Sequence, residues 1–581
     1  MRFFSILGSG VAVVLAAAAA LSLSMTPAAT KPSAHPAMMK MTAAAPAPAL
    51  APAPGCAYHL IDVQKYGMQP FAAAPVIRSV NHVLTIELDV QYTDAATTTI
   101  AGCHVHLRTY GGKLIGPTLR VAPGDSMHIT VVNKLPSGTT KCPMPENGPM
   151  GNDLDITNLH THGLHVSPSG ISDNVFIEIC PQAPGQPYVI DIPKDQPPGT
   201  YWYHAHVHGS TAVQVSSGME GAIIVEGGID TVPEIAKAAE KTFLLQQISY
   251  DQQGVIESLG QFTPTSWPDS KRTITVNGQI APVITMRPGE VQHWRFIHGG
   301  VRETIDLYAT TGTTLNEVST DGNALGRIDA WKQLELEPGY RSDVLFKAPL
   351  LPAGQSTMRY YLRSAPLKGT QRLQFRKIPG GTIAQLNAQL NAVQPGAVIA
   401  VIDVSGAPQD MAMPTNAELA PFVPFQPITP GELNGAPQTM AFSIENAICN
   451  GSSVACTPCD PNKKPANPAC GIRFMVDDFQ YPDSPTRQMK LNTASKWDLS
   501  VAESSLALTH PFHIHVNPFE MVRTGPDGKP ETVWKDTLLV RQGQPTQVLS
   551  RYTDFTGAFV LHCHILDHED QGMMQRVEIV P

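Results

Sequence analysis

The stretch LHCHILDHEDQGMM, residues 561–574, places a cysteine between two histidines near the end of a 581-residue chain. A third histidine follows the cysteine by five residues, and a methionine follows it by ten. Thiolate, imidazole and thioether groups all bind transition metals. In a β-strand, neighbouring side chains point to opposite faces, so a strand here would separate the cysteine from its two flanking histidines. The stretch therefore predicts a strand that serves metals on both of its faces.

Strand-like segments with alternating apolar and polar residues occur three times in related form. They are PTLRVAPGDSMHITVVNKL (117–135), VITMRPGEVQHWRFIHGG (283–300) and MKLNTASKWDLSVAESS (489–505), and the third lacks the Pro-Gly of the other two. Such alternation around a turn predicts half-buried strands. The chain is too long for one ordinary domain. We predict an all-β protein of three consecutive β-sandwich domains, at about residues 56–228, 235–405 and 425–581.

The composition supports a turn-rich β protein and excludes one class of partner. The chain has 52 prolines and 46 glycines, which suits many short strands joined by turns. Charged residues make up only 15% and the formal net charge is −9. A chain without a basic surface does not attract nucleic acid, so we expect none as a partner.

The first 55 residues have the composition of targeting and linker segments. Residues 1–29 begin with one arginine and a long apolar run that ends in small residues, which predicts an export signal. The alternative is an uncleaved membrane anchor, because the run approaches the length that spans a bilayer. Residues 30–55 are rich in Ala and Pro and predict a disordered tether. We expect an exported protein, periplasmic or secreted, with no stable membrane insertion after cleavage.

The chain has nine cysteines, an odd number for an exported protein. Cysteines pair in oxidising compartments, so one is left over. The residue between two histidines, Cys563, is the natural exception, and the other eight then form up to four disulfides. The segment 449–470 holds four of them and predicts a disulfide-stapled insertion. A redox or zinc site at Cys456 and Cys459 is the alternative.

Four His-x-His pairs occur at matching places in the first and last predicted domains. HTHG and PPGTYWYHAH in the first parallel HIH and DFTGAFVLHCH in the last. On a strand, residues i and i+2 face the same side, so each pair presents two imidazoles together. The pairs predict one shared cluster of eight histidines, whereas His104, His106 and His208 are interpreted as coincidental. The eight are His160, His162, His204, His206, His513, His515, His562 and His564.

Alternation assigns a second, separate metal site to the last domain. Cys563 faces away from His562 and His564, and His510, at an odd offset from His513, turns to the side of Cys563. His568 and Met573 complete the set. One thiolate, two imidazoles and a thioether are the ligands of a blue-copper electron-transfer site. Zinc also accepts Cys and His, but the methionine favours copper.

The first domain lacks the counterparts of this second site. Aligned with the last domain, it has Ala205 in place of the cysteine and Thr157 in place of His510. Ser210 and Val215 stand where His568 and Met573 would be. We therefore expect only the last domain to take in electrons.

The segments HTHG, WYHAH, HPFHIH and HCHILDHEDQGMM occur in an order and at a spacing that resemble the multicopper oxidases, in particular the laccase-like type. The resemblance implies three cupredoxin-like Greek-key sandwiches and four copper ions. It implies a type 2 copper on His160 and His513 and a type 1 copper on His510, Cys563, His568 and Met573. The two type 3 coppers would be held by His162, His204, His206, His515, His562 and His564.

The same resemblance implies an oxidase that couples one-electron oxidations to the reduction of O2 to water. We expect substrates to give electrons near an exposed His510, from which they pass through Cys563 to the histidine cluster. Water formation requires protons, and buried carboxylates are suitable donors. Asp173 matches the position of the acid in the family, although Asn174 stands where glycine is usual, and Glu569 is the second candidate.

The methionine ligand favours electron-rich reductants, because it donates electron density to the copper. Small phenols, aromatic amines or metal ions are the expected partners beside O2, with a laccase-like oxidase as the main interpretation. A periplasmic cuprous or other metal-ion oxidase for copper tolerance is the alternative, although Met411 and Met413 are the nearest approach to a methionine cluster. A non-catalytic copper-binding protein of the cell envelope, or one that only sequesters copper, remains a further alternative. A monomer is favoured.

Overall fold

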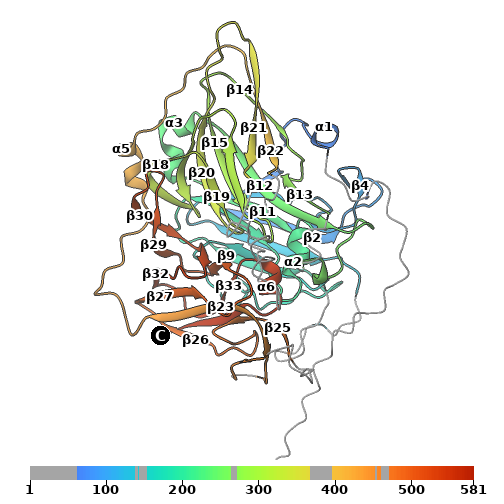
Figure 1. Cartoon of the computed structure of the whole chain (residues 1–581), viewed down its shortest axis with the longest axis vertical. Coiled ribbons are helices and arrows are strands. Elements are labelled where there is room, and N and C mark those ends of the chain that lie inside the picture. Colours follow the sequence, from blue (N-terminus) through green and yellow to red (C-terminus); the bar gives the residue numbers. More distant parts are fainter. Residues whose placement is uncertain are drawn as a thin grey trace, which may run out of the picture. The chain divides into compact units, whose positions relative to one another are not determined.

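Each of the three related segments forms a strand, a tight turn and a second strand. The computed structural model describes residues 56, 62–137, 142, 154–262, 271–366, 396–451, 454–459 and 470–581 (Figure 1). The three strand pairs are β6 (Thr118–Val121) with β7 (Ser126–Asn133), β14 (Val283–Met286) with β15 (Val291–His298), and β26 (Arg487–Lys490) with β27 (Thr493–Val501). The predicted export signal and tether lie outside the described residues.

The turns explain why the third segment manages without Pro-Gly. Gly124 and Gly289 adopt positive φ angles of 89° and 74° in the first two turns. Asn492 adopts a φ of 60° in the third. Asparagine enters this left-handed region more readily than most residues with a side chain, so it can replace the glycine.

The strands of the first predicted span form two main sheets. The first sheet has the order β1-β6-β11-β10-β8 and the second the order β5-β2-β7-β9, with β3 and β4 as a separate pair. Their bounds are β1 (Val76–Arg78), β2 (Val83–Tyr92), β3 (Thr99–Ile100), β4 (Cys103–His104), β5 (Arg108–Tyr110), β8 (His160–His162), β9 (Gln186–Asp191), β10 (Gly199–His204) and β11 (Glu220–Val225).

The strands of the middle span also form two sheets. Their orders are β13-β12-β15-β20-β17-β18 and β14-β22-β21-β16-β19. The bounds are β12 (Ala239–Tyr250), β13 (Lys271–Val276), β16 (Ile305–Ala309), β17 (Leu315–Thr320), β18 (Asn323–Trp331), β19 (Leu334–Leu336), β20 (Arg341–Lys347), β21 (Thr357–Ser364) and β22 (Val398–Ser405).

The strands of the last span repeat the arrangement. One sheet has the order β24-β23-β27-β32-β29-β30, with β25 paired to β23, and the other the order β26-β34-β33-β28-β31. The bounds are β23 (Gln438–Ile448), β24 (Thr457–Pro458), β25 (Gly471–Val476), β28 (Thr509–Ile514), β29 (Phe519–Thr524), β30 (Pro530–Lys535), β31 (Thr537–Arg541), β32 (Thr546–Tyr552), β33 (Gly557–Cys563) and β34 (Met574–Val580).

Strand pairing has the same pattern in all three pairs of sheets. The second strand of each repeated segment lies parallel to an earlier strand: β7 to β2, β15 to β12 and β27 to β23. The first strand lies parallel to the last strand of its span: β6 to β11, β14 to β22 and β26 to β34. Each pair of sheets encloses its own apolar core, and the three belong to one compact unit. The protein is thus all-β, with cupredoxin-like sandwiches; the domain boundaries stay predictions.

The described helices are short and connect strands. They are α1 (Val63–Tyr66), α2 (Thr211–Ser216), α3 (Pro233–Ala236), α5 (Asn416–Leu419) and α6 (Leu566–Glu569), with 3-10 turns η1 (Gly228–Thr231), η2 (Leu259–Phe262) and η5 (Ala420–Phe422). Within the described ranges, no helix has the length and apolar character needed to cross a bilayer.

The cysteines pair as the odd count predicts. Among the described residues, the disulfides are Cys56–Cys103, Cys142–Cys180, Cys449–Cys456 and Cys459–Cys470. Cys563 is the free cysteine, and it is buried. Because Cys456 and Cys459 are each in a disulfide, the alternative of a redox or zinc site at that pair does not hold.

Candidate metal centre

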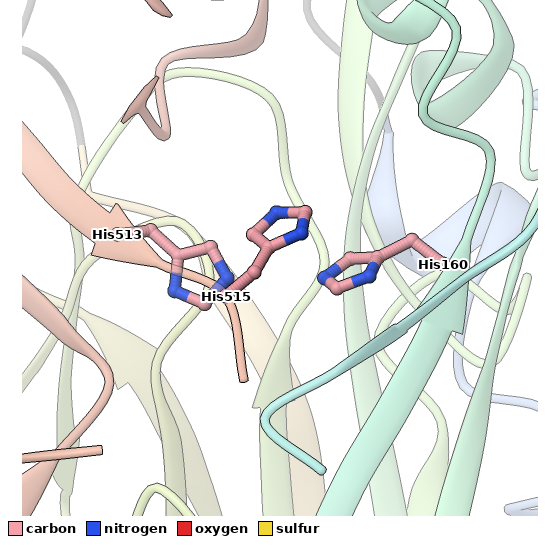
Figure 2. Close-up of side chains that lie close together, drawn as sticks. All are labelled: His160, His513 and His515. Atoms are coloured by element: carbon pink, nitrogen blue, oxygen red, sulfur yellow. The ribbon is translucent and has the colours of Figure 1, made fainter. Parts of the chain in front are cut away.

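Eight histidines meet between the first and last pairs of sheets. In the first pair, β8 lies antiparallel to β10, which sets His160 opposite His204. In the last pair, β28 lies antiparallel to β33, which sets His513 opposite His562. The second histidine of each His-x-His pair follows two residues later, so each sandwich presents four imidazoles, and all eight are buried. Figure 2 shows His160 facing His513 and His515 across this interface.

The rings pack against one another across the two sandwiches. His160 stacks on His515 with 3.9 Å between ring centroids, and His162 stacks on His513 at 3.8 Å. The Nε2 atom of His562 lies 3.2 Å from Nε2 of His206 and 3.3 Å from Nε2 of His515. The two sandwiches therefore share one cluster, and neither contains it alone.

In several of the rings, one nitrogen is hydrogen-bonded to the protein and the other faces the cluster. The Nδ1 atoms of His160, His204 and His513 are bonded to Asp173, the Ala205 carbonyl and the Asp536 carbonyl. Their Nε2 atoms have no hydrogen-bond partner among the described residues. His162 is reversed: its Nε2 contacts Asp536 and its Nδ1 has no such partner.

These buried nitrogens without a hydrogen-bond partner fit a metal-binding site. Buried polar atoms without a partner are rare because each costs free energy, and a metal ion would satisfy these nitrogens. Three sets of nitrogens lie within 4.8 Å of one another: His160/His513/His515, His160/His162/His204 and His206/His515/His562. The donor set therefore fits a cluster of several transition-metal ions.

Burial also keeps the imidazoles in the form that binds metals. Desolvation, the largest cause, lowers the pKa of His204 to about 3 and of His513 to about 4. For His160, His206 and His562, burial comes first and neighbouring histidines second, and both lower the pKa. Neutral imidazole is the metal ligand, so protons do not compete with the metal near neutral pH.

A second group of side chains lies on the opposite face of β33. The sulfur of Cys563 is 3.5 Å from Nδ1 of His510 and 3.8 Å from Nδ1 of His568. The Ile565 amide donates to the same sulfur at 3.4 Å. Met573 is buried in the same core, and its carbonyl accepts from the Cys563 amide at 3.1 Å. The structure thus brings together the four residues that the sequence predicts for the second metal.

Burial raises the pKa of the Cys563 thiol well above its usual value. A thiolate at this depth needs a compensating positive charge, and a bound metal ion deprotonates a thiol outright. The raised pKa therefore agrees with a cysteine that ionises only when it binds metal.

The expectation of an exposed His510 is wrong. Its side chain is 0% exposed, and its ring packs against Phe442 of β23 at 5.3 Å between centroids. His568 is 2% exposed and packs against Phe474 of β25 at 5.3 Å. The hairpin formed by β23 and β25, which carries the disulfide-stapled insertion, supplies both phenylalanines. Neither imidazole of this group is therefore open to solvent.

The two candidate acids both contact the histidine cluster. The oxygens of Asp173 lie 3.1 and 3.0 Å from Nδ1 of His160, and the Thr161 amide donates to Oδ1 at 2.9 Å. Burial raises the pKa of Asp173 to about 7. Glu569, on α6, has oxygens 3.5 Å from Nδ1 of His206 and 3.6 Å from Nδ1 of His562, and burial raises its pKa.

Sequence reasoning missed two acidic residues at this interface. Asp536 lies between β30 and β31, with Oδ1 3.2 Å from Nε2 of His162. Asp570 accepts backbone hydrogen bonds from Gly209, Thr211 and Ala212 at 2.7 to 3.2 Å, which ties α6 to α2. Asp570 directly follows Glu569, so the sequence offered a weak signal for it. Asp536 follows no recognised motif, and only the pairing of β28 with β31 places it at the cluster.

The place in the first sandwich that corresponds to the second metal site holds ordinary polar contacts. Thr157 donates to Gln214 Oε1 at 2.8 Å, and Ser210 donates to the Ile156 carbonyl at 3.1 Å. Val215 is buried in an apolar cluster. His208, interpreted as coincidental, packs against Tyr481 at 4.8 Å between centroids.

Comparisons with known proteins agree with this geometry. Two family models, both described as multicopper oxidase, match residues 150–228 and 462–581. The chain is 23% identical over 487 residues to the multicopper oxidase mco of Staphylococcus aureus, covering 81% of this chain and 83% of that one. It is 23% identical over 514 residues to a laccase of Bacillus stratosphericus, covering 82% and 91%. The multicopper oxidase of Campylobacter jejuni, a metallo-oxidase, has a similar structure, with a TM-score of 0.64, 21% identity and coverage of 90% and 97%.

The fold and the clustered donor side chains fit a copper-binding oxidase built from cupredoxin-like sandwiches. The two family models and the laccase relatives support a laccase-like multicopper oxidase that uses oxygen.

Proposed function

We propose that the enzyme couples the one-electron oxidation of phenols and similar electron-rich molecules to the four-electron reduction of O2 to water. The observation that supports this most directly is the juxtaposition of two sites on one strand. Cys563, with His510 and His568 nearby, faces one side of β33, and the eight-histidine cluster lies on the other. Bound copper would supply one-electron redox chemistry at the first site and O2 reduction at the second.

We assign four copper ions to twelve side chains. The eight histidines divide between one type 2 copper, on His160 and His513, and a type 3 pair. The type 3 ligands are His162, His204, His206, His515, His562 and His564. The type 1 ligands are His510, Cys563, His568 and Met573. The buried nitrogens without a hydrogen-bond partner and the close grouping of His510, Cys563 and His568 support this assignment.

The chain's own residues connect the two sites over a short path. Electrons that enter at Cys563 cross one peptide unit to reach His562 or His564. The His562 Nδ1 atom lies 3.1 Å from the Cys563 carbonyl, which gives a second, hydrogen-bonded route. Phe442 and Phe474 exclude water from the entry site.

We propose that Asp173 and Glu569 hold and deliver the protons that water formation consumes. Each is buried and contacts histidines of the cluster through Nδ1 atoms. Asp173→Asn and Glu569→Gln should each slow O2 reduction by roughly 10²-fold while leaving the reduction of the blue copper by substrate unchanged. Anaerobic stopped-flow reduction followed by mixing with O2 separates the two steps. If both variants reoxidise at the wild-type rate, the proposed role is wrong.

Among the described residues, the placement of Met411 and Met413 favours phenolic substrates over cuprous ions. Met411 and Met413 pack against an apolar cluster of the middle span, and the Met411 sulfur accepts from the Val291 amide at 3.4 Å. They are therefore engaged in packing and do not form a soft-ligand site. The relatives include both a laccase and a metallo-oxidase, so a cuprous oxidase is the alternative. A diphenol and Cu(I), assayed side by side with and without added copper, distinguish the two.

One experiment tests the function as a whole. Purified protein should contain four coppers per chain, show an intense blue absorption band and consume O2 with a diphenol. Copper binding without O2 uptake would support the alternative of a non-catalytic copper-binding protein, and absence of the blue band would contradict the type 1 site. The disulfides support an exported, oxidising location, which cell fractionation can test.

A further inference from the structure

A segment of the middle pair of sheets lies directly against the histidine cluster. Gly339 precedes β20 with a φ of +90°, and a Cβ atom there would lie 3.1 Å from Cδ2 of His564 and 3.2 Å from Cε1 of His162. Only glycine allows such a close approach in this conformation. The middle pair of sheets contributes none of the eight histidines, yet its backbone packs against two of them.

Two residues after Gly339, Arg341 carries a buried charge toward the cluster. Its guanidinium, 0% exposed in the side chain, donates from Nη1 to Asp536 Oδ1 at 2.7 Å and from Nη2 to Asp536 Oδ2. A further bond from Nη1 to the Gly339 carbonyl, at 2.9 Å, fixes the guanidinium to its own turn. Such a two-pronged pair sets the orientation of a carboxylate as well as its charge.

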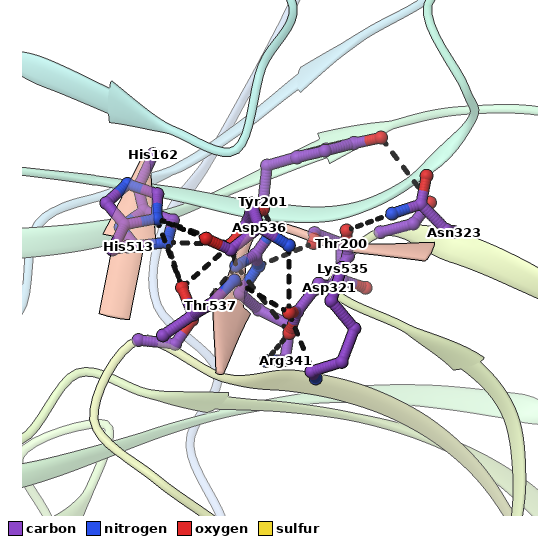
Figure 3. Close-up of polar contacts among 12 residues, drawn as sticks. His162, Thr200, Tyr201, Asp321, Asn323, Arg341, His513, Lys535, Asp536 and Thr537 are labelled. Carbon is purple, nitrogen blue, oxygen red and sulfur yellow. Dashed lines mark hydrogen bonds and ion pairs between the residues drawn. The ribbon is translucent and has the colours of Figure 1, made fainter. Parts of the chain in front are cut away.

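Asp536, fixed in this way, contacts two histidines from different sandwiches. Its Oδ1 lies 3.2 Å from Nε2 of His162, and its carbonyl accepts from Nδ1 of His513 at 2.8 Å. The hydroxyl of Thr537 donates to the same Oδ1 at 2.8 Å and lies 3.3 Å from His162 and 3.1 Å from His513 (Figure 3). The turn between β30 and β31 thus contacts both stacked rings.

Asp321, also from the middle pair of sheets, holds that turn from the other side. Its Oδ1 accepts from the Arg341 amide at 3.0 Å. Its Oδ2 accepts from the amides of Asp536 and Thr537, each at 3.3 Å, and lies 3.0 Å from Nζ of Lys535. Two buried acids and two buried bases therefore balance within a network of Arg341, Asp321, Lys535, Asp536 and Thr537, which we call the Arg341 network (Figure 3).

The network determines which nitrogen of His162 is available to a metal. A neutral imidazole carries one N–H, and an ionised carboxylate can only accept, so Asp536 selects the form with hydrogen on Nε2. Nδ1 of His162 is then left as the lone-pair donor that faces the cluster. His160, His204 and His513 present Nε2 instead. Without a fixed Asp536, the His162 ring could turn and remove its donor atom.

We propose that Arg341 and Asp321 are positioning residues through which the middle pair of sheets fixes the ring orientation of His162 and His513 for copper binding. The proposal rests on the proposed function only in taking these two histidines as cluster ligands. It assigns the middle third of the chain, which has no copper ligand, control over loading of the histidine cluster. The proposal predicts no effect on the Cys563 site, because the Arg341 network does not contact that site.

The test compares Arg341→Lys with Arg295→Lys as a matched control. Arg295 is equally buried: its Nη2 donates to both oxygens of Asp230 at 2.7 Å, its Nη1 donates to Asp343 at 2.8 Å, and no contact joins it to the eight histidines. Lysine keeps the charge of each arginine but cannot reproduce the set of bonds that either guanidinium makes. Loss of a buried pair should lower the unfolding temperature of both metal-free variants to a similar extent.

Copper content is the first readout, measured against a competing chelator. We expect Arg341→Lys to keep the blue band and to lower the affinity for the remaining coppers by about 10- to 100-fold, the usual effect of losing a partner of a metal-bound histidine. Arg295→Lys should bind copper as the wild type does. Wild-type affinity in Arg341→Lys, or equal losses in both variants, would overturn the proposal. A wild type that binds no copper in the cluster would instead contradict the proposed function.

The second readout needs no copper. In metal-free protein with ¹⁵N-labelled histidine, long-range ¹H–¹⁵N spectra report which ring nitrogen carries hydrogen. The wild type should show His162 with hydrogen on Nε2 only, and Asp321→Asn, which keeps the shape of the side chain, should show both forms. If Asp321→Asn shows His162 with hydrogen on Nε2 only, the role of Asp321 is overturned. This measurement does not depend on Arg341→Lys, so it can be made even if that variant fails to fold.

Discussion

At the scale of single residues, the side chain of Cys563 points to one face of β33, and those of its two neighbours point to the other. Its sulfur lies 3.5 and 3.8 Å from two imidazoles, whereas His562 and His564 belong to the histidine cluster. Strand alternation alone predicts this division. Under the proposed function, this side chain decides whether electrons can enter, and its replacement has a specific expected result.

Cys563→Ser should abolish the blue band and turnover while the protein stays folded. Serine is nearly isosteric but does not replace a thiolate as a copper ligand, and burying its hydroxyl costs about 1–3 kcal/mol. Copper analysis should fall from four ions per chain to three, and the circular dichroism spectrum should be unchanged. A serine variant that keeps the blue colour would show that the sulfur does not bind copper.

Met573→Leu should raise the reduction potential of the blue copper. Met573 is fully buried in the core that contains Cys563, so leucine of similar volume can replace it. Losing the thioether removes electron density from the copper and favours its reduced form. A redox titration of the blue band measures the shift, and an unchanged or lower potential would argue against Met573 as the axial ligand.

Sequence reasoning could predict these residues as ligands because their chemistry and spacing are local. It could not identify Asp536, because the contact with His162 joins positions 374 residues apart. It also could not decide which nitrogen of His162 faces the cluster. The burial of His510 escaped prediction for a related reason: the covering Phe442 belongs to a strand about 70 residues earlier, and no local pattern reports that packing.

At the scale of elements, the repeated strand–turn–strand unit was predictable because both its alternation and its turn chemistry are local. The three units begin and end close to the predicted segments, and the degenerate third unit uses Asn492 in place of glycine. The partners of each strand were not predictable, since parallel neighbours such as β2 and β7 are far apart in the chain. Strand pairing also creates charge interactions that alternation does not reveal.

Pairing of β16 with β19 sets Asp306 opposite Glu335, two acids on adjacent strands. Burial, and then the charge of Glu335, raise the pKa of Asp306 from 3.8 to about 6. The folded state therefore binds this proton more tightly than the unfolded state. The resulting stabilisation is present below about pH 4 and is lost as pH rises through about 6.

Asp306→Asn should remove this pH dependence, because the amide stays neutral. Between about pH 4 and pH 6, the wild type should lose about 1–3 kcal/mol of unfolding free energy relative to the variant. Urea denaturation of both proteins at several pH values in this range measures the difference. A constant difference across the range would contradict a raised pKa for Asp306.

At the scale of the whole molecule, the histidine cluster joins the first and last sandwiches, and the Arg341 network joins both to the middle one. The Asp570 carboxylate adds a further connection by accepting amides from the start of α2. Metal bound at such an interface stabilises only the assembled arrangement. The metal and the fold should therefore be thermodynamically linked.

Removal of copper with a chelator should lower the unfolding temperature of the whole protein. A ligand that binds only the folded state stabilises it by about 4 kcal/mol at a free concentration a thousand times its dissociation constant. Calorimetry of the metal-free and reloaded protein measures the change. When Cys563→Ser is reloaded with copper, its unfolding temperature should rise only by the part that is due to ions in the histidine cluster. Identical unfolding temperatures with and without copper would show that the ions do not bridge the sandwiches.

The position of the last strands has a consequence for how the enzyme is made. Four of the eight cluster histidines come from the first sandwich and four from the last, so more than 300 residues separate the two halves of the cluster along the chain. Under the proposed function, a nascent chain that has made only the first sandwich holds half of the ligands. The histidine cluster can then take up its ions only after the strand with His562 and His564 has been synthesised and has packed against the first sandwich.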